Sequence, residues 1–333
     1  MEEPKDKNKE QEIEYHDNII DPKEISALEQ LKNSLATVTD SKDKAVFDIF
    51  VLCNNDFLIR FLRAKKLNVK KTTRMILDYF HWKAKINLED IYLNYEFKEK
   101  YKMQIMFPHG FHKITKDGYP VYFEIIGNFN VEEFFKIAPI DEMMRYEAKI
   151  METLDRDYFK ICSKLKGAYI YGIFSIMDFK GINSSILNKK LFSYMSELSK
   201  LQEYYPENLA GCYVINAGII FRSLYFACKA FLSESNKQKI KVFGDNYKEA
   251  LLEKINKEDL PKFYGGVCEC PGGCLFSNAG PWQKQDEIEE NIPEDILKKR
   301  KEINDIMTFG KIQISAEDQI KDYGNKGANL DEL

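Results

Sequence analysis

The segment from Tyr204 to Gly244 carries two strand-like apolar runs separated by a stretch with helical periodicity. The runs are Cys212–Ile215 and Ile240–Phe243. Between them, apolar side chains recur at helical spacing, at Phe221, Leu224, Tyr225, Cys228, Phe231 and Leu232. A strand, a helix and a second strand in this order predict a βαβ crossover. By pattern alone the helix more simply covers the sheet, and the alternative is a movable lid over an apolar cavity.

Periodic patterns predict further helices and strands on both sides of this segment. The continuous apolar run Ala168–Met177 is typical of a central buried strand. The turn Thr115–Gly118 separates two strand-like runs and predicts a hairpin within 111–126. Helices are expected at Ile25–Leu35, in 43–85, and at 98–107, 140–165, 186–202 and 247–255, with a charged helix outside the core at Glu287–Ile306. Helices and strands in this arrangement indicate an α/β fold.

Polarity and charge divide the chain into four parts. We predict a polar N-terminal tail at 1–40, a helical region at 41–96, an α/β domain at 97–283 and a charged C-terminal tail at 284–333. Residues 1–24 and 284–333 each carry a net charge of −5, so the total of −4 leaves about +6 for the residues between them. A mildly basic body without a concentrated Lys/Arg tract suits an anionic surface better than sequence-specific nucleic-acid binding.

Cysteine usage and hydropathy indicate the compartment. The seven cysteines are an odd number, and the chain begins with a charged segment rather than a signal peptide. Both features indicate a reducing environment. No apolar run approaches the length that spans a bilayer. These observations predict a soluble, cytosolic protein.

The sequence lacks the common motifs of nucleotide binding and hydrolysis. It has no G-x-x-x-x-G-K-[ST], no G-x-G-x-x-G and no G-x-S-x-G. Asp178–Gly181 matches the D-x-x-G of GTPase switches, but without a phosphate loop it is interpreted as a strand-to-loop turn. We therefore predict that the protein is not an enzyme.

Metal binding is also not predicted. Cys268, Cys270 and Cys274 offer three zinc ligands at irregular spacing, and reduced thiols in a turn are the favoured interpretation. His109 and His112 have no other ligand at suitable spacing nearby, so we expect them to be surface histidines.

Two groups of charged residues offer a candidate binding site. Arg63–Lys66 presents three cations within four residues, and the simpler interpretation is a solvated helix end. Glu207 and Lys239 stand at opposite ends of the predicted crossover, where an exposed ion pair is the default explanation. At the mouth of an apolar cavity the same groups would instead orient a ligand.

A series of short motifs follows a fixed order between about residues 55 and 282. They are Leu58–Lys66, Lys116–Gly118 with Pro120–Glu124, Ile176–Gly181, Tyr204–Glu207, Ile215–Ala217, Leu260–Pro261 with Tyr264–Gly266, and Gly280–Trp282. In this order they resemble the CRAL-TRIO lipid-binding family, and within it the Sec-fourteen-type phosphatidylinositol transfer proteins. Any one motif alone is weak, but so many in order identify the family.

The resemblance implies a fold and a lid. A helical N-terminal bundle precedes an α/β/α domain whose β-sheet floors an apolar lipid pocket, and an amphipathic helix gates that pocket. In this chain the gate is expected at about Ile219–Leu232, and its apolar face would consist of Phe221, Leu224, Tyr225, Cys228, Phe231 and Leu232. The resemblance therefore favours the lid over the simple cover.

The resemblance also implies a headgroup site. Lys66 and Lys239 are expected to meet the phosphate of phosphatidylinositol, and Glu207 is expected to accept inositol hydroxyls. Two neighbouring positions differ from the family, since Lys65 replaces the usual arginine and Thr115 replaces a common acid. Lysine keeps the charge of arginine but loses its bidentate fork.

A second headgroup pattern, for phosphatidylcholine, is less complete. Tyr122 is in place and Ser175 keeps a hydroxyl. Phe111, Ile173 and Leu201 replace positions that carry hydroxyls in the family. We therefore expect phosphatidylinositol to be preferred, and choline-lipid binding to be weak or to use other contacts.

Together these features predict a cytosolic phosphatidylinositol transfer protein that needs no cofactor besides its bound phospholipid. The implied partners are phosphatidylinositol, a second lipid, a membrane surface visited transiently and a phosphoinositide kinase, with no nucleic acid. The chain is expected to be a monomer, peripheral on Golgi, endosomal or other internal membranes. The alternatives are a CRAL-TRIO carrier of a sterol, tocopherol-like or retinoid ligand, and a lipid-gated interaction module with little bulk transfer. A neutral ligand would not need the cations Lys66 and Lys239.

Overall fold

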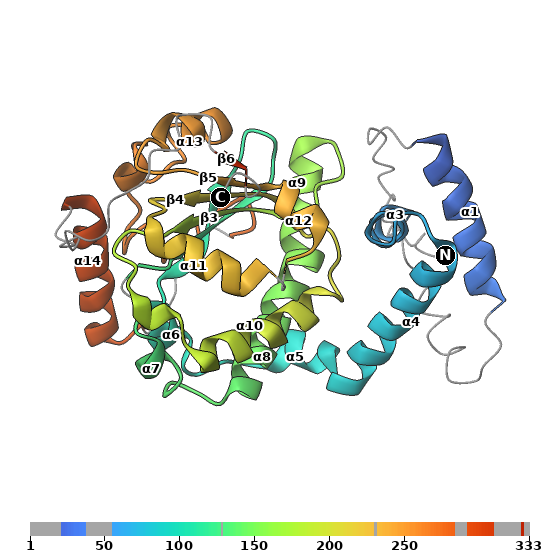
Figure 1. Ribbon diagram of the computed structural model, residues 1–333, viewed down its shortest axis with the longest axis horizontal. Helices are drawn as coiled ribbons and strands as arrows, with labels where there is room; N and C mark the ends of the chain where they lie inside the picture. Colours follow the sequence, from blue (N-terminus) through green and yellow to red (C-terminus); the bar gives the residue numbers. More distant parts are fainter. Residues whose placement is uncertain are drawn as a thin grey trace, which may run out of the picture.

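The computed structural model describes residues 21–37, 55–127, 129–229, 232–283, 292–309 and 328–329. Helices α1 (Pro22–Ala36), α3 (Asn55–Ala64) and α4 (Val69–Ile86) form a group at one end of the molecule, on the right of Figure 1. The rest is a mixed β-sheet with helices on both faces. The predicted α/β fold with N-terminal helices is therefore confirmed.

The sheet has the strand order β1-β2-β3-β4-β5-β6 in the described part of the chain. Its strands are β1 (His109–Ile114), β2 (Pro120–Ile125), β3 (Ile173–Asp178), β4 (Leu209–Ile215), β5 (Ile240–Val242) and β6 (Ala328–Asn329). Strands β2 to β5 are parallel, whereas β1 and β6 pair antiparallel at the two edges. The predicted hairpin and the βαβ crossover from β4 to β5 are both confirmed.

Alternate strand residues point to opposite faces of the sheet, and each face packs on its own layer of helices. Phe123, Ile176 and Tyr213 face α13 (Lys248–Lys254) and η4 (Lys262–Tyr264). The other face packs on α8 (Ile140–Thr153), α10 (Lys189–Gln202) and α11 (Ile219–Cys228). Shorter described helices connect these layers: α5 (Leu88–Asn94), α6 (Lys100–Met106), α7 (Val131–Phe134), η1 (Leu154–Tyr158), α9 (Phe159–Lys166), η2 (Ser184–Ile186) and α12 (Glu234–Gln238).

Helix α1 lies in the segment that was predicted to be a polar tail. Its Leu28, Leu31 and Leu35 recur at helical spacing and are buried in a cluster with residues of α3 and α4. The helix begins after Asp21, whose side chain accepts a hydrogen bond from the backbone N–H of Lys23 at 2.8 Å. The packed helical region therefore includes Pro22–Ala36.

Helix α14 (Glu294–Phe309) also packs on the body, so the prediction of a charged helix outside the core was wrong. Ile296 and Arg300 are buried, and Arg300 Nη2 donates to Gln104 Oε1 of α6 at 3.0 Å. The aliphatic stem of an arginine can cover apolar surface when its guanidinium finds a partner. A pattern of charges along the sequence does not reveal such a partner.

Two predicted boundaries also differ from the structure. Strand β3 begins at Ile173 rather than Ala168, because Gly172 has φ +91° and interrupts the extended chain. Helix α11 ends at Cys228 rather than Leu232.

A buried polar cluster joins the N-terminal helices to the α/β domain. The carboxylate of Glu152 in α8 accepts hydrogen bonds from Lys83 Nζ at 2.9 Å and from Tyr205 OH at 2.8 Å. Next to it, the rings of Trp82 and Tyr204 stack with centroids 4.3 Å apart. These contacts fix the turn Tyr204–Glu207 against α4, and they thereby position Glu207.

Candidate functional site

Glu207 and Lys239 form a half-buried ion pair at the end of the crossover. Lys239 Nζ lies 2.7 Å from Glu207 Oε2, and the Ser235 hydroxyl donates to the same oxygen at 3.1 Å. The side chain of Lys239 is 26% exposed and that of Glu207 is 18% exposed. Glu207 has φ +58°, an uncommon conformation for a non-glycine residue that aims its side chain toward α12. The two residues therefore retain accessible polar atoms beside one another.

Lys66 approaches the same place from the N-terminal helices. The pKa of Glu234, at the start of α12, is lowered mainly by a hydrogen bond from Lys237 and further by the charge of Lys66. Lys66 and Leu67 have positive φ, so the chain bends sharply after α3 and presents Lys66 beyond the helix end. Glu207 and Lys239 therefore meet beside α12, and the charge of Lys66 acts on the first residue of that helix, although Lys66 is far from both in the sequence. Lys65 precedes the same bend and is half-buried.

Thr115 has a local structural contact instead. Its hydroxyl is buried and accepts a hydrogen bond from the backbone N–H of Tyr119 at 3.0 Å, within the turn of the β1–β2 hairpin. This contact closes the turn, and a role for Thr115 in headgroup binding stays a prediction.

The sheet face below α8, α10 and α11 carries the predicted residues Tyr122 and Ser175, which are directly paired across β2 and β3. The Ser175 hydroxyl donates to Glu124 Oε2 at 3.2 Å. Tyr122 and Glu124 are only half-buried although helices cover this face, so their side chains border accessible space. The ring of Phe111 lies 4.6 Å from that of Tyr122, which places an apolar ring where a hydroxyl was expected. Leu201 lies elsewhere, in the cluster of the N-terminal helices.

Two carboxyl groups on this inner face were missed by the sequence reasoning. Burial raises the pKa of Glu124 to about 7, the charge of Glu147 adds to this effect, and the hydrogen bond from Ser175 opposes it. Burial likewise raises the pKa of Glu147 to about 7, against a hydrogen bond from the Tyr194 hydroxyl at 3.1 Å. The sequence shows Glu124 in a predicted strand and Glu147 in a predicted amphipathic helix. It does not show that the folded chain brings the two carboxyl groups near one another.

We expect Glu124→Gln to stabilise the protein at alkaline pH. The folded pKa of about 7 exceeds the ordinary value of 4.5, so the stability contributed by the bound proton is complete below about pH 4.5 and is lost as the pH rises through 7. Glutamine imitates the neutral carboxyl group. Its gain in the free energy of unfolding should be on the order of 1–3 kcal/mol at about pH 8 and near zero at about pH 5. Urea denaturation at both pH values measures it.

The matched control is Glu203→Gln, which changes an exposed glutamate at the end of α10 and should have no such pH dependence. An equal effect of Glu124→Gln at the two pH values would contradict the shifted pKa.

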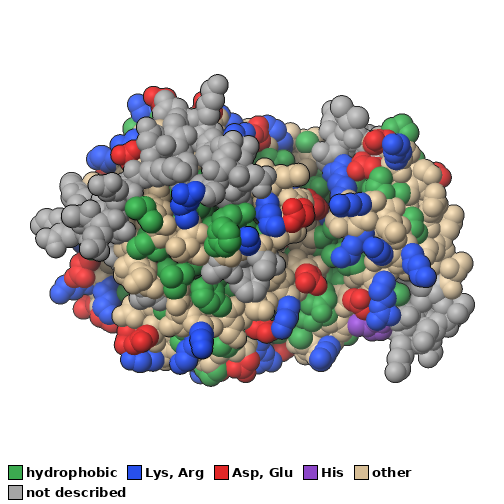
Figure 2. Space-filling model, viewed as in Figure 1, with side chains coloured by type: hydrophobic (Ala, Val, Ile, Leu, Met, Phe, Trp, Pro, Cys, Tyr) green, Lys and Arg blue, Asp and Glu red, His purple; other side chains and the backbone are tan. Residues whose placement is uncertain are grey.

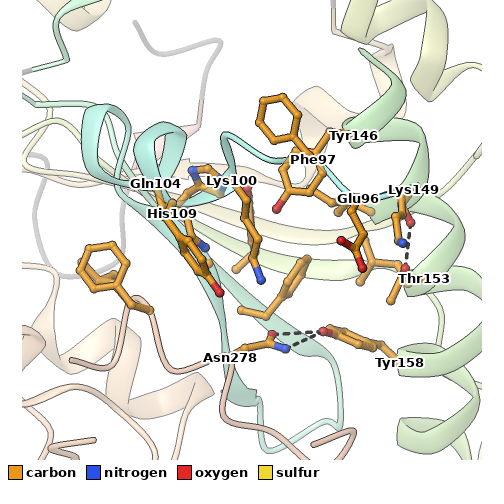
Figure 3. A pocket seen from close by; sticks show the side chains of 18 of the residues that line it. Glu96, Phe97, Lys100, Gln104, His109, Tyr146, Lys149, Thr153, Tyr158 and Asn278 are labelled. Carbon is orange, nitrogen blue, oxygen red and sulfur yellow. Dashed lines mark hydrogen bonds between the residues drawn. The ribbon is translucent and has the colours of Figure 1, made fainter. Parts of the chain in front are cut away.

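An open cavity of about 630 Å³ lies beside β1, between α6, α8 and the segment after η4 (Figure 3). Figure 3 shows Glu96, Lys100 and Tyr158 directed toward the same space, with Tyr158 OH and the Asn278 side chain joined by hydrogen bonds. Tyr122 contributes to the lining, so the cavity borders the inner sheet face. Its mixture of aromatic, cationic and acidic groups suits an amphiphilic molecule better than a purely apolar one.

The two histidines expected at the surface are buried, so that prediction was wrong. His109 lies on the wall of this cavity, and its Nδ1 is 2.6 Å from the carbonyl oxygen of Phe107. Burial lowers the pKa of both His109 and His112 to about 4. Both imidazoles are therefore neutral at neutral pH.

Helix α11 has apolar side chains on two faces. On the inner face, Phe221 and Leu224 are buried in the main core cluster, and Tyr225 packs against it. Leu232, which follows the helix, packs against the same cluster. On the outer face, Ile219 is 58% exposed and Phe226 is 70% exposed. Figure 2 shows hydrophobic side chains gathered over this helix. The predicted gate residue Phe231 and the side chain of Cys228 lie outside the described residues.

The D-x-x-G sequence at Asp178 is a structural turn, as predicted. The buried carboxylate of Asp178 accepts hydrogen bonds from Asn216 Nδ2 at 2.7 Å, from the backbone N–H of Lys180 at 2.9 Å and from Tyr264 OH at 3.0 Å. These contacts join the ends of β3 and β4 to η4.

No helix of the described part of the chain is long and apolar enough to cross a membrane.

These features define an α/β domain in which a sheet with an amphiphilic inner face lies beneath an apolar helix. The family model described as CRAL/TRIO domain matches residues 105–266. The Sec14 cytosolic factor of Schizosaccharomyces pombe is 37% identical over 235 residues, which cover 70% of this chain and 82% of that protein. The chain belongs to the CRAL/TRIO family, and within it to the Sec14-like lipid-binding and transfer proteins.

Plant relatives are longer than this chain. Two phosphatidylinositol/phosphatidylcholine transfer proteins of Arabidopsis thaliana, SFH11 and SFH12, are 34% and 30% identical over 72% and 84% of this chain. The matches span 65% and 51% of those proteins. A solved structure described as the crystal structure of Sfh5 covers 67% of this chain and 80% of that one, with a TM-score of 0.49 and 15% identity, too remote to inform the site.

Proposed function

We propose that this protein binds phosphatidylinositol and transfers it between membranes. The observation that carries the proposal is the ion pair of Glu207 and Lys239 beside α12, on whose first residue the charge of Lys66 also acts. The apolar helix α11, a candidate for the movable lid, belongs to the same domain. Lysine ammonium groups bind phosphate as point charges, and a carboxylate accepts hydrogen bonds from inositol hydroxyls. A neutral sterol or retinoid has no phosphate for these lysines to bind.

The chemistry of the acyl chains explains why such a protein needs a lid. Roughly 30 methylene groups at about 0.8 kcal/mol each would cost on the order of 20 kcal/mol if a phospholipid entered water unprotected. Headgroup contacts do not supply that much free energy, so the interior must replace the bilayer around the chains. Helix α11 suits this role because its inner face packs in the core cluster and its outer face exposes Ile219 and Phe226. Exchange then requires α11 to open against a membrane.

The function proposed is transport rather than catalysis. The resident ligand is phospholipid, and no cofactor takes part in exchange. The protein acts from the cytosol on internal membranes, and it presents phosphatidylinositol to a phosphoinositide kinase. The relatives whose names describe phosphatidylinositol/phosphatidylcholine transfer support the lipid class.

We expect phosphatidylinositol to be bound in preference to phosphatidylcholine. Phe111 packs on Tyr122 without a hydroxyl, and Ile173 offers none on the neighbouring strand, so a choline phosphate would be left poorly hydrogen-bonded. Each missing hydrogen bond to a charged group is worth about 1.5–3 kcal/mol, so the preference should be at least about tenfold. Competition between two labelled lipids in one vesicle assay measures it.

Mass spectrometry of the lipids that co-purify with the protein is the test of the function itself. Inositol phospholipid should dominate the bound fraction. A sterol or retinoid as the main bound species would overturn the proposal, and equal uptake of the two phospholipids would overturn only the expected selectivity.

A further inference from the structure

We propose that the chain holds a structural Zn²⁺ ion between His112, Cys268, Cys270 and Cys274. One ligand atom from each of these residues, a ring nitrogen of His112 and the three sulfurs, all lie within 4.8 Å of one another. The residues come from two parts of the chain, since His112 is on β1 and the cysteines follow η4. This site is separate from α12 and its proposed headgroup residues.

The spacing of the sulfur atoms fits tetrahedral zinc. Cys268 Sγ and Cys270 Sγ are 3.8 Å apart. A Zn–S bond of about 2.3 Å in a regular tetrahedron places neighbouring sulfurs about 3.8 Å from each other. A disulfide would require about 2.05 Å, and the three cysteines are unbonded thiols. The geometry therefore matches shared coordination rather than a disulfide bond.

The imidazole of His112 is held in the manner of a metal ligand. The side chain is 1% exposed, and Nδ1 lies 3.2 Å from the Ser277 hydroxyl. The imidazole also interacts with the backbone of Asp259. Metal-bound histidines commonly use one ring nitrogen for the metal and the other for a polar partner. The polar contacts of His112 therefore fix its ring beside the three sulfurs.

Backbone contacts hold the three cysteines in place without the metal. The N–H of Cys268 donates to the carbonyl of Leu260 at 3.1 Å, and its carbonyl accepts from the N–H of Lys262 at 3.1 Å. Between Cys270 and Cys274 the chain turns through Gly272 and Gly273, both with positive φ. This turn folds the two thiols toward Cys268. A site with four protein ligands and a preformed backbone is typical of structural rather than catalytic zinc.

Zinc is the metal that this donor set favours. Three thiolates and one imidazole form a soft to borderline set, and zinc adopts the tetrahedral geometry that they offer. Binding releases the three thiol protons and leaves a complex of net charge −1. The thiols that were expected to be merely reduced are thus assigned as ligands. The sequence showed three of the four, and the fourth is visible only once β1 lies beside the turn.

The ion would join the segment after η4 to β1 at the edge of the sheet. The two segments already approach closely, because a Cβ on Gly110 would lie 2.3 Å from the carbonyl oxygen of Leu275. Leu275, Phe276 and Asn278 line the open cavity beside β1. The proposed zinc site therefore stabilises one wall of that cavity, and its loss should lower the melting temperature and loosen the wall.

The test is metal analysis of the full chain purified under reducing conditions without chelators. We expect about one zinc per chain by plasma mass spectrometry. Replacement by Co²⁺ should give intense visible d–d bands and a thiolate-to-cobalt charge-transfer band, which report tetrahedral sulfur coordination without any substitution. Cys270→Ser, at a partly exposed position, and His112→Gln should each lower zinc occupancy at least about tenfold.

Cys162→Ser is the matched control, because Cys162 is a buried free thiol outside the cluster and its variant should keep the metal. Zinc below about a tenth per chain, both as purified and after addition of equimolar Zn²⁺, would overturn the proposal. So would a Cys270→Ser variant with unchanged zinc, or a cobalt spectrum without the charge-transfer band.

Discussion

The double variant Lys66→Ala/Lys239→Ala should lose transfer of phosphatidylinositol while remaining folded. Each charge-assisted contact to a phosphate is worth about 1.5–3 kcal/mol, so the loss of two should lower affinity for the inositol lipid by at least about tenfold. Removal of Lys239 leaves Glu207 with its hydrogen bond from Ser235 and with access to solvent, so the cost in stability should stay below about 1 kcal/mol. Transfer between vesicles, measured beside a thermal melt, separates the two effects.

A matched control tests whether position rather than charge decides the outcome. Lys70→Ala/Lys241→Ala removes the same two charges from exposed lysines in α4 and β5, close to Lys66 and Lys239 in the sequence. This variant should transfer the lipid normally. If both double variants lost transfer equally, the effect would be one of net charge at the membrane. If neither lost it, the assignment of the headgroup site would be wrong.

The variant Phe226→Asp should weaken membrane binding and slow lipid exchange without unfolding the protein. Phe226 is 70% exposed on the outer face of α11, and the ammonium group of Lys229 lies 3.9 Å from the centre of its ring. Burial of such a ring in a bilayer surface contributes about 1.5–3 kcal/mol, and a carboxylate in its place adds a penalty. We expect at least about tenfold weaker sedimentation with vesicles and a comparable fall in exchange. The free energy of unfolding should change by less than about 0.5 kcal/mol, because the site is exposed.

Leu165→Asp is the matched control for this variant. Leu165 is 63% exposed on α9, so the substitution adds the same charge to another exposed apolar position. If α11 is the surface that opens onto the membrane, only Phe226→Asp should reduce exchange. Equal behaviour of the two variants would remove the special role of α11. A large drop in the melting temperature of Phe226→Asp would instead identify α11 as a fixed part of the core.

Local patterns determined the elements and their order. The run Cys212–Ile215, the helical spacing from Phe221 and the run Ile240–Phe243 predicted a βαβ unit that the structure contains. This succeeds because side-chain periodicity reports directly which residues of a helix or strand face an apolar layer. The order of motifs likewise identified the family, since it depends on sequence alone.

Contacts between distant segments were decided only by the tertiary structure. The sequence named Lys66, Glu207 and Lys239 through the family resemblance, but their approach to α12 depends on the bend after α3 and on the docking of Tyr204–Glu207 against α4. Glu124 and Glu147 gave no signal, because a shifted pKa arises from burial and from neighbours that local periodicity does not specify.

The environments of His112, α14 and α11 are three further features that local sequence patterns do not predict. His112 was expected at the surface, and the packing of β1 against the cysteine turn buries it. The charged pattern of α14 predicted a solvated helix, but its buried Ile296 and the hydrogen bond from Arg300 to Gln104 join it to the body. Periodicity correctly placed an apolar helix at α11 but by itself favoured a simple cover of the sheet, and only the family resemblance favoured the lid. The exposure of Ile219 and Phe226 on the outer face is a property of the folded surface, because solvent contact is set by what the rest of the chain leaves uncovered.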